Sequence, residues 1–281
     1  MEGNIHVYCI NLKHRKDRWN RFSAQPELAV LKQSYELERF EGINGSAINI
    51  QKDERISLRT KRNIKDNTRR EHVDLDSAGG VGCYLSHTTI WKKFLERSEP
   101  YAMILEDDIS LDPGFTAKFQ RAMKDTTLLP DEPDVWFFMP PSEWYYDYKG
   151  VDFPLTTTAN QIGPWVTNTC AAFTGYLISR RGAERLLESA FPIDMHVDLY
   201  TCLNGELKRT INVYHKNVNV GVYALELLDS DIQVSSDKTC TICDVPTNYR
   251  RKGIIIVNMP ILVMGLVVIG ALFYLSKPRR R

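Results

Sequence analysis

Three consecutive carboxylates, Glu106, Asp107 and Asp108, are the residues of this chain best placed to do chemistry. They follow residues 101–105, a mostly apolar run without alternation, which is typical of a strand buried on both faces. In an open α/β sheet, ligands bind beyond the carboxyl ends of the strands. Mg²⁺ and Mn²⁺ favour carboxylate oxygens and keep coordination positions for substrate phosphates. The triplet therefore predicts a divalent cation that carries a phosphate ester; a polar, solvated turn is the alternative.

A second candidate feature precedes a helical pattern. The glycines of residues 79–82 come before residues 83–97, whose apolar side chains recur with helical spacing. Glycines at the start of a helix leave backbone N–H groups free to meet a phosphate, although a simple turn has the same composition. His87 lies on the apolar side of this helix, which favours a core histidine over a catalytic one.

The rest of the pattern supplies the elements that must position these residues. Apolar runs indicate strands, and stretches with helical periodicity indicate helices. The two alternate along the chain, so the fold class is α/β with a mostly parallel sheet. Ser179 is expected to cap the helix that follows it. The expected strands lie at 5–12, 101–105, 134–139, 173–179 and 211–223, and the expected helices at 14–22, 83–97 and after 179.

Two stretches carry further expectations. Residues 51–80 are highly charged and poor in large apolar side chains, which predicts a mobile excursion or a lid. Asp194 and Asp198 stand four residues apart, so they share one face if that segment is helical.

Composition narrows the class of protein. The chain has 281 residues, enough for one large domain or two small ones, and 43% are hydrophobic and 25% charged. A formal charge of +1 argues against a nucleic-acid binder with a strongly basic surface. The pair Cys240 and Cys243 has no second pair and no nearby histidine, so a zinc site is not expected there.

The sequence of the C-terminal region predicts a membrane anchor. Residues 254–275 form an apolar run of 22 residues without a charge. As a helix they would span about 33 Å, close to the hydrocarbon core of a bilayer. We therefore expect a basic linker at 241–253, a single transmembrane helix at 254–275 and a basic tail at 276–281.

The N-terminus shows no secretory signal, so we expect the catalytic domain on the cytosolic face. Asn44-Gly45-Ser46 is a glycosylation sequon that would report entry of the domain into the lumen.

Six short motifs follow one another along the chain: VYCINL at 7–12 with Arg15, Asp17 and Arg18, RFEGING at 39–45, GCYLSH at 82–87, ILEDD at 104–108, GYLIS at 175–179 and PID at 192–194. In these motifs and their order the chain resembles glycosyltransferase family 25, which includes lipopolysaccharide-type and procollagen galactosyltransferases. The resemblance covers roughly residues 4–222. The C-terminal anchor is not a common feature of that family.

The resemblance implies a single α/β domain of the glycosyltransferase A (Rossmann-like) type, here residues 1–240. It implies a UDP-hexose donor (galactose or glucose), a divalent metal (Mn²⁺ or Mg²⁺) and inversion at the anomeric carbon. The acceptor would be a hydroxyl of a glycan, a lipid-linked glycan or a hydroxylysine-type protein side chain. Such chemistry needs a cation against the leaving diphosphate and a carboxylate that takes the acceptor proton.

The resemblance also implies roles for single residues. Asp108 is expected to bind the metal, and Glu106 the donor or the metal, with Asp107 as a rival for the donor contact. Asp194 matches the later acidic motif and is expected as the catalytic base or a second metal contact. Asp198 is the weaker candidate for the base. The residues expected to hold the uridine or diphosphate are Asn11, Arg15 and Arg18, and surface salt bridges are the alternative for the two arginines.

Two other functions use the same features. A metal-dependent nucleotidyl- or phosphotransferase would share the acidic strand end, but the chain has no GxxxxGK[ST] loop. A catalytically inactive, membrane-anchored glycan-binding or scaffold protein would keep the fold, and the intact acidic triplet argues against it. The expected partners are a UDP-sugar, an acceptor and a membrane, but no nucleic acid.

Overall fold

The residues of the computed structural model fall into two units. The first, Met1–Asn67 with Val73–Ser235, contains every helix and strand named below. The second consists of Thr68–His72 and Ser236–Arg281. The structure describes residues 5–68, 74–124, 132–138, 165–167, 173–208, 210–216 and 222–224.

The expected linker at 241–253, membrane helix at 254–275 and basic tail at 276–281 all lie outside the described residues. Among the helices of the described ranges, none combines the length and the hydrophobicity needed to cross a bilayer.

Within the described residues, seven strands form the main sheet in the order β2-β1-β3-β7-β5-β8-β6. Parallel pairs join β1 to β2 and to β3, and β5 to β8. β7 is antiparallel to both of its neighbours, and β6 is antiparallel to β8. The strands are β1 Ile5–Asn11, β2 Glu36–Glu41, β3 Tyr101–Glu106, β5 Val135–Phe137, β6 Trp165–Thr167, β7 Gly175–Ser179 and β8 Val213–Lys216; β4 Ile109–Leu111 and β9 Val222–Ala224 form a separate pair.

The α/β class is confirmed, but the expectation of a mostly parallel sheet is wrong because the sheet is mixed. A strand buried on both faces has the same apolar composition in either direction, so its sequence does not encode its direction. β2 was not predicted at all. Its charged sequence, ELERFE, belongs to an edge strand whose side chains are half-buried or exposed.

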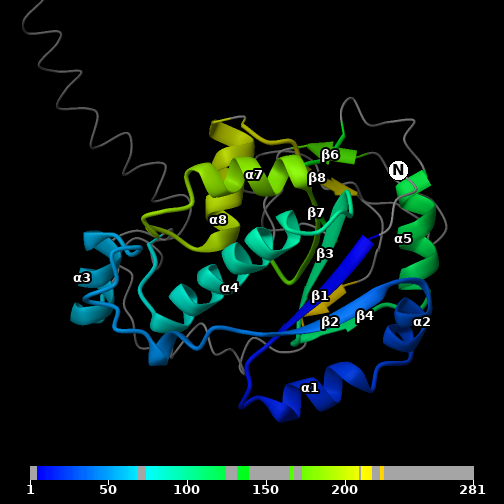
Figure 1. Ribbon diagram of the computed structural model, residues 1–281, viewed down its shortest axis with the longest axis horizontal. Helices are drawn as coiled ribbons and strands as arrows, with labels where there is room; N and C mark the ends of the chain where they lie inside the picture. Colours follow the sequence, from blue (N-terminus) through cyan, green and yellow to red (C-terminus); the bar gives the residue numbers. More distant parts are fainter. Residues whose placement is uncertain are drawn as a thin grey trace, which may run out of the picture. The chain divides into compact units, whose positions relative to one another are not determined.

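Helices cover both faces of the sheet (Figure 1). The side chains of β3 alternate between two hydrophobic clusters: Ala102 and Ile104 join one, and Met103 and Leu105 the other, and all four are fully buried. The first cluster includes residues of α4 (Ala78–Leu95), α7 (Arg180–Glu188) and α8 (Val197–Cys202). The second includes residues of α1 (Lys16–Ser23), α2 (Pro26–Ser34) and α5 (Phe115–Lys124). β3 therefore runs through the middle of the core and ends at the acidic triplet.

The charged stretch at 51–80 is folded against the core where the structure describes it, which corrects the expectation of a mobile excursion. Ser57 caps α3 (Leu58–Asp66) by accepting a hydrogen bond from the Thr60 N–H. The Ser57 N–H and the Thr60 hydroxyl both donate to the carbonyl of Ile193, at 3.0 and 3.1 Å. Ile56, only 2% exposed, packs in the core beside Ile193. Hydrogen bonds and a few buried apolar side chains, Ile56 and Leu75, anchor this segment, so its overall charged composition did not reveal it.

Asp194 precedes α8, which begins at Val197. Asp194 and Asp198 therefore do not share a helical face, which corrects the conditional expectation of one. Residues 193–195 are instead extended and bridge to Ile56 and Asp74.

α4 begins inside the glycine-rich segment. Ser77 is its N-cap and accepts a hydrogen bond from the Gly80 N–H at 3.1 Å, so the glycines lie within the helix rather than before it. Gly82 and Gly45 allow α4 to touch the loop after β2. A Cβ on Gly82 would lie 2.4 Å from the Ile43 carbonyl oxygen and 2.6 Å from the Gly45 nitrogen. The Gly82-Cys83 motif thus reflects close packing of two backbones.

This contact predicts that one glycine-to-alanine substitution within a helix destabilises the protein. Alanine normally stabilises a helix by about 1 kcal/mol relative to glycine. Gly82→Ala should instead lower the free energy of unfolding by roughly 1–3 kcal/mol, because its Cβ overlaps backbone atoms that are held in place. Chemical denaturation measures the change, with Thr89→Ala on the exposed side of the same helix as the control. Stabilisation by Gly82→Ala would contradict the packing described here.

Candidate active site

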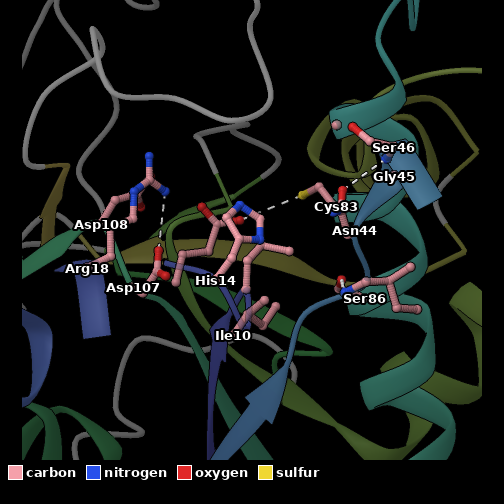
Figure 2. A pocket seen from close by; sticks show the side chains of 14 residues that line it. Ile10, His14, Arg18, Asn44, Gly45, Ser46, Cys83, Ser86, Asp107 and Asp108 are labelled. Atoms are coloured by element: carbon pink, nitrogen blue, oxygen red, sulfur yellow. Dashed lines mark hydrogen bonds and ion pairs between the residues drawn. The ribbon is translucent and has the colours of Figure 1, made fainter. Parts of the chain in front are cut away.

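A cavity lies at the carboxyl ends of β1 and β3 (Figure 2). Ile10 and Leu12 from the end of β1 form an apolar wall. The loop at 43–46 and the first turns of α4, with Gly79, Cys83 and Ser86, form the opposite wall. The acidic triplet, Arg18 and His14 complete the lining. The cavity therefore combines apolar surface, backbone and concentrated negative charge.

The acidic triplet occupies the predicted place. β3 ends at Glu106, and Asp107 and Asp108 form the turn into β4. Burial raises the pKa of Glu106 to about 8, and the charge of Asp107 adds to the rise. Burial likewise raises the pKa of Asp108 to about 6 and raises that of Asp107. Burial thus makes each of the three groups harder to ionise than in water.

Arg18, a buried residue of α1, supplies positive charge to the triplet. It is 6% exposed, and its Nη1 lies 3.3 Å from both an Asp107 oxygen and an Asp108 oxygen. α1 carries Arg18 to this point, because the parallel pairing of β1 with β3 brings the end of β1 beside Glu106. Arg18, predicted to hold the donor, lines the cavity and lies against the triplet.

Asn11 is 1% exposed and all of its polar atoms are engaged. Its Nδ2 donates to Asp107 Oδ2 and, at 3.0 Å, to the Arg15 carbonyl. Its Oδ1 accepts from the Arg39 guanidinium. Asn11 therefore orients Asp107, and it lines a neighbouring cavity with Arg39 and Trp19 rather than the one at the triplet.

Arg15, also predicted to hold the donor, forms an ion pair with Asp17 at 2.8 Å. Its side chain lines neither of the two cavities described here.

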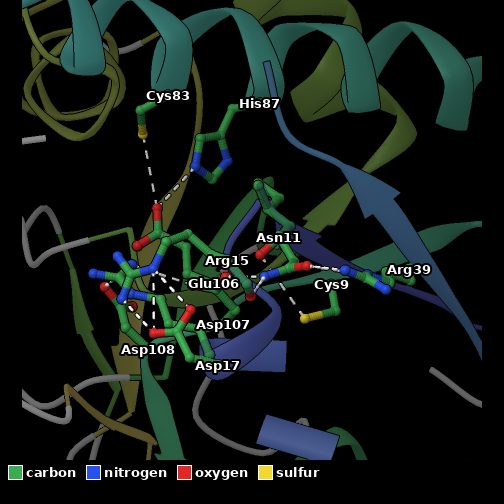
Figure 3. A network of polar contacts seen from close by, with 12 residues as sticks. Cys9, Asn11, Arg15, Asp17, Arg39, Cys83, His87, Glu106, Asp107 and Asp108 are labelled. Atoms are coloured by element: carbon green, nitrogen blue, oxygen red, sulfur yellow. Dashed lines mark hydrogen bonds and ion pairs between the residues drawn. The ribbon is translucent and has the colours of Figure 1, made fainter. Parts of the chain in front are cut away.

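Cys83 and His87 of α4 meet Glu106 (Figure 3). The Cys83 thiol donates to Glu106 Oε1 at 3.8 Å, and His87 Nε2 lies 3.2 Å from the same oxygen. Burial lowers the pKa of His87 to about 3, so its imidazole is neutral. His87 is a core histidine as predicted, being fully buried, yet it contacts a residue of the site.

The two later carboxylates differ in their surroundings. Asp194 receives two hydrogen bonds from Arg59, at 2.6 and 3.1 Å, and one from the Ser57 hydroxyl at 2.7 Å. Neither Asp194 nor Asp198 lines the cavity. The charge of Asp198, in the first turn of α8, contributes to raising the pKa of Glu106 and of Cys83. Of the two, Asp198 is the carboxylate whose field reaches the triplet.

Sequence reasoning missed several residues of the site. The Asn44-Gly45 turn and the Gly82–His87 motif were noted, but nothing in their spacing placed them against the triplet. Ser86 was missed as well: it ties the two walls together by accepting a hydrogen bond from the Ile43 N–H at 2.8 Å. Gly45 and Gly82 were the available signal for this contact, because a residue without a Cβ lets two backbones approach closely.

The donor set suits a hard divalent cation. Oδ1 of Asp108 is buried and has no hydrogen-bond partner among the described residues. Glu106 and Asp108 both have raised pKa values, which a nearby positive charge would lower again. Carboxylate oxygens are the ligands that Mg²⁺ and Mn²⁺ prefer.

Fold and site together define a mixed α/β protein with a carboxylate-lined cavity at the carboxyl ends of its central strands. The chain belongs to glycosyltransferase family 25: the family model described as glycosyltransferase family 25 (LPS biosynthesis protein) matches residues 4–201. This confirms the family resemblance drawn from the motifs.

Curated relatives carry matching names. A glycosyltransferase 25 family member of Aedes aegypti is 27% identical over 203 residues, covering 70% of this chain and 31% of the relative. Procollagen galactosyltransferase 2 of Homo sapiens is 25% identical over 190 residues, covering 66% and 28%. Procollagen galactosyltransferase 1-A of Xenopus laevis is 29% identical over 190 residues, covering 65% and 28%. The matched segment spans less than a third of the length of these relatives.

The raised pKa of Glu106 predicts how stability depends on pH when divalent cations are chelated. In the folded chain Glu106 keeps its proton up to about pH 8, against an ordinary pKa of 4.5. Between these values the folded state binds more protons than the unfolded state, so the free energy of unfolding falls as the pH rises. The melting temperature should therefore fall as the pH rises, by about 2–4 °C for each kcal/mol of stability lost.

Glu106→Gln is the matched variant, because the amide keeps the shape of the side chain but does not titrate. Its melting temperature should change less than that of the wild type over the same pH interval. Equal pH slopes for the two proteins would show that Glu106 ionises in its ordinary range.

Proposed function

We propose that the protein transfers a hexose from a UDP-sugar to an acceptor hydroxyl, with inversion at the anomeric carbon and with a divalent cation. One observation carries the proposal: the acidic triplet ends a buried central strand and lines a cavity that also offers apolar and backbone surface. Family membership adds that the reaction is a glycosyl transfer.

Asp108 and Glu106 are the residues that would hold the cation, Mn²⁺ or Mg²⁺. The unpartnered Asp108 Oδ1 and the raised pKa of both carboxyl groups support this choice. When bound, such a cation neutralises the charge that develops on the leaving diphosphate. Arg18 adds a guanidinium on the same side, where it would bind a phosphate oxygen or keep Asp107 and Asp108 in place.

The cavity walls would bind the nucleotide. Ile10, Leu12 and Ile43 offer apolar contacts to a flat base, and residues 44–46 offer backbone groups that can read its edge. Asp107 is held by Asn11 and Arg18, so its carboxylate has a defined position for a ribose or sugar hydroxyl. Arg15 remains a proposed phosphate contact at the end of β1.

We place the catalytic base at Asp198 and keep Asp194 as the alternative. A base must have a free carboxylate oxygen within reach of the acceptor hydroxyl. Arg59 and Ser57 engage both oxygens of Asp194 and tie it to α3, which suits an anchor. Asp198 also lies outside the cavity lining, but it is partly exposed and its charge acts on Glu106, which favours it as the base.

The names of the relatives favour galactose over glucose, and a protein hydroxyl among the acceptors. Because this chain spans less than a third of those relatives, sugar and acceptor remain proposals to be tested on this protein itself.

We also propose the membrane anchor and the cytosolic placement, on the sequence grounds given above. Asn44 and Ser46 of the sequon are exposed and line the proposed donor cavity. A glycan on Asn44 would therefore both report entry into the lumen and stand beside the donor site.

The first test asks whether the protein uses a UDP-hexose, whether it needs a divalent cation and whether it needs Asp108. UDP release from a panel of UDP-hexoses should require Mn²⁺ or Mg²⁺, and Asp108→Asn should abolish it while the fold is kept. Asp112→Asn, a nearby aspartate that does not line the cavity, is the control. Full turnover by Asp108→Asn at limiting Mn²⁺ would remove Asp108 from the cation site.

The same assay separates the alternative functions. Cleavage elsewhere in the nucleotide would support a nucleotidyl- or phosphotransferase, and no reaction with any donor or acceptor would support a scaffold.

The second test assigns the base. Asp198→Asn should lower kcat by roughly 10²–10⁴-fold and leave donor binding intact, as loss of a general base does. Asp194→Asn and Arg59→Met should behave alike, because each breaks the same ion pair, and both should mainly lower thermal stability. If Asp194→Asn lowered kcat by that factor and Arg59→Met did not, Asp194 would be the base.

A further inference from the structure

We propose that Trp91, Tyr176 and His87 form a directed hydrogen-bond chain that holds His87 as its Nε2–H tautomer and thereby positions Glu106 in the cavity. The tautomer follows from the contacts alone, and only its catalytic consequence rests on the proposed function. His87 does not line the cavity, so its role is to position Glu106 rather than to touch a substrate.

The chain runs through the core between α4 and the sheet. Trp91 Nε1 donates to the Tyr176 hydroxyl at 2.8 Å, and that hydroxyl lies 2.9 Å from His87 Nδ1. His87 Nε2 lies 3.2 Å from Glu106 Oε1. Trp91, Tyr176 and His87 are all fully buried, so water cannot replace any of these partners.

The direction of the chain follows from what each group can donate. An indole N–H only donates, so the Tyr176 oxygen accepts from Trp91. The hydrogen of Tyr176 then has one acceptor among the described residues, which is Nδ1 of His87. A neutral imidazole that accepts at Nδ1 carries its hydrogen on Nε2, and that hydrogen points at Glu106 Oε1.

The opposite arrangement is costly. If His87 Nδ1 carried the hydrogen, the Tyr176 oxygen would accept twice and its own O–H would be buried without an acceptor among the described residues. An unsatisfied buried donor costs about 1–3 kcal/mol. The ring is also confined, because Phe173 lies edge-on to it with centroids 5.1 Å apart. Packing and hydrogen bonding therefore select one tautomer and one orientation.

The carboxyl group of Glu106 is held through a single oxygen. Cys83 Sγ donates to the same Oε1 that His87 contacts, as Figure 3 shows. Neither donor engages Oε2, which leaves this oxygen for the cavity that Glu106 lines. The chain thus fixes which oxygen of Glu106 a donor or a cation meets.

The same residues pose a rival interpretation. Cys83, His87 and Glu106 offer ligand atoms within 4.8 Å of one another, a set that would suit Zn²⁺. Zinc on Nε2 needs that nitrogen without its hydrogen, which would leave the Tyr176 O–H without an acceptor. The two interpretations therefore predict opposite tautomers and can be separated by measurement.

The first measurement needs no activity. Two-bond ¹H–¹⁵N correlation spectra of the full-length protein, purified with a chelator, report which nitrogen of each histidine carries hydrogen, and the His87 signals are those lost in His87→Gln. We expect the Nε2–H tautomer in the wild type, and a shift toward the other tautomer or an exchanging mixture in Tyr176→Phe. An Nδ1–H tautomer in the wild type would overturn the proposal. So would a thiolate-to-metal absorption band when Co²⁺, used as a zinc probe, is added and Cys83→Ser removes the band.

The second measurement uses two matched variants of His87. His87→Gln can still place an amide N–H near Glu106 Oε1, whereas His87→Asn is too short to reach it. Losing a group that orients a ligand costs typically 10–100-fold in affinity or activity. We expect His87→Asn to raise the Mn²⁺ concentration for half-maximal UDP release by about that factor, with His87→Gln close to the wild type. Equal loss in two folded variants would contradict a positioning role, and if neither variant folds, Tyr176→Phe provides the same comparison.

Discussion

The structure depends on placing three carboxyl groups at the largely buried end of a central strand. Burial raises the pKa of Glu106, Asp107 and Asp108, so each carboxyl group is harder to ionise than in water. Arg18 provides the nearest compensation, and it reaches the triplet because β1 and β3 are parallel neighbours in the sheet. α1 follows β1 after a short loop and so places Arg18 where β3 ends. In the proposed function, a divalent cation held by these carboxyl groups would meet the phosphates of the nucleotide sugar.

The opposite wall of the cavity results from backbone contact rather than from side-chain chemistry. Gly45 and Gly82 let the loop after β2 lie directly on α4, and Ser86 ties the two together. This close approach brings Cys83 and His87 above Glu106, so the two walls of the cavity are joined through hydrogen bonds to one carboxyl group. The acidic triplet is therefore held from both faces of the sheet, by Asn11 and Arg18 on one side and by α4 on the other.

The extent of the family match agrees with this arrangement. The matched residues, 4–201, run from the start of β1 into α8 and include every residue assigned a role here. The relatives are more than three times as long as the segment they share with this chain. The shared segment is thus the unit that builds the cavity.

Local patterns in the sequence were enough to predict several features. The buried strand ending in Glu106, the helix that carries His87, the cap at Ser179 and the α/β class all follow from burial and capping signals between near neighbours in the chain. Tertiary structure alone decided which strands run antiparallel, that Arg59 engages Asp194, and that residues 51–68 are docked on the core. It also decided the partners of the site: Arg18 and Asp107 are 89 positions apart, as are His87 and Tyr176. A side chain's chemistry is set by its own type, but its pKa, its hydrogen-bond direction and its partner are set by groups that only folding brings within a few ångströms.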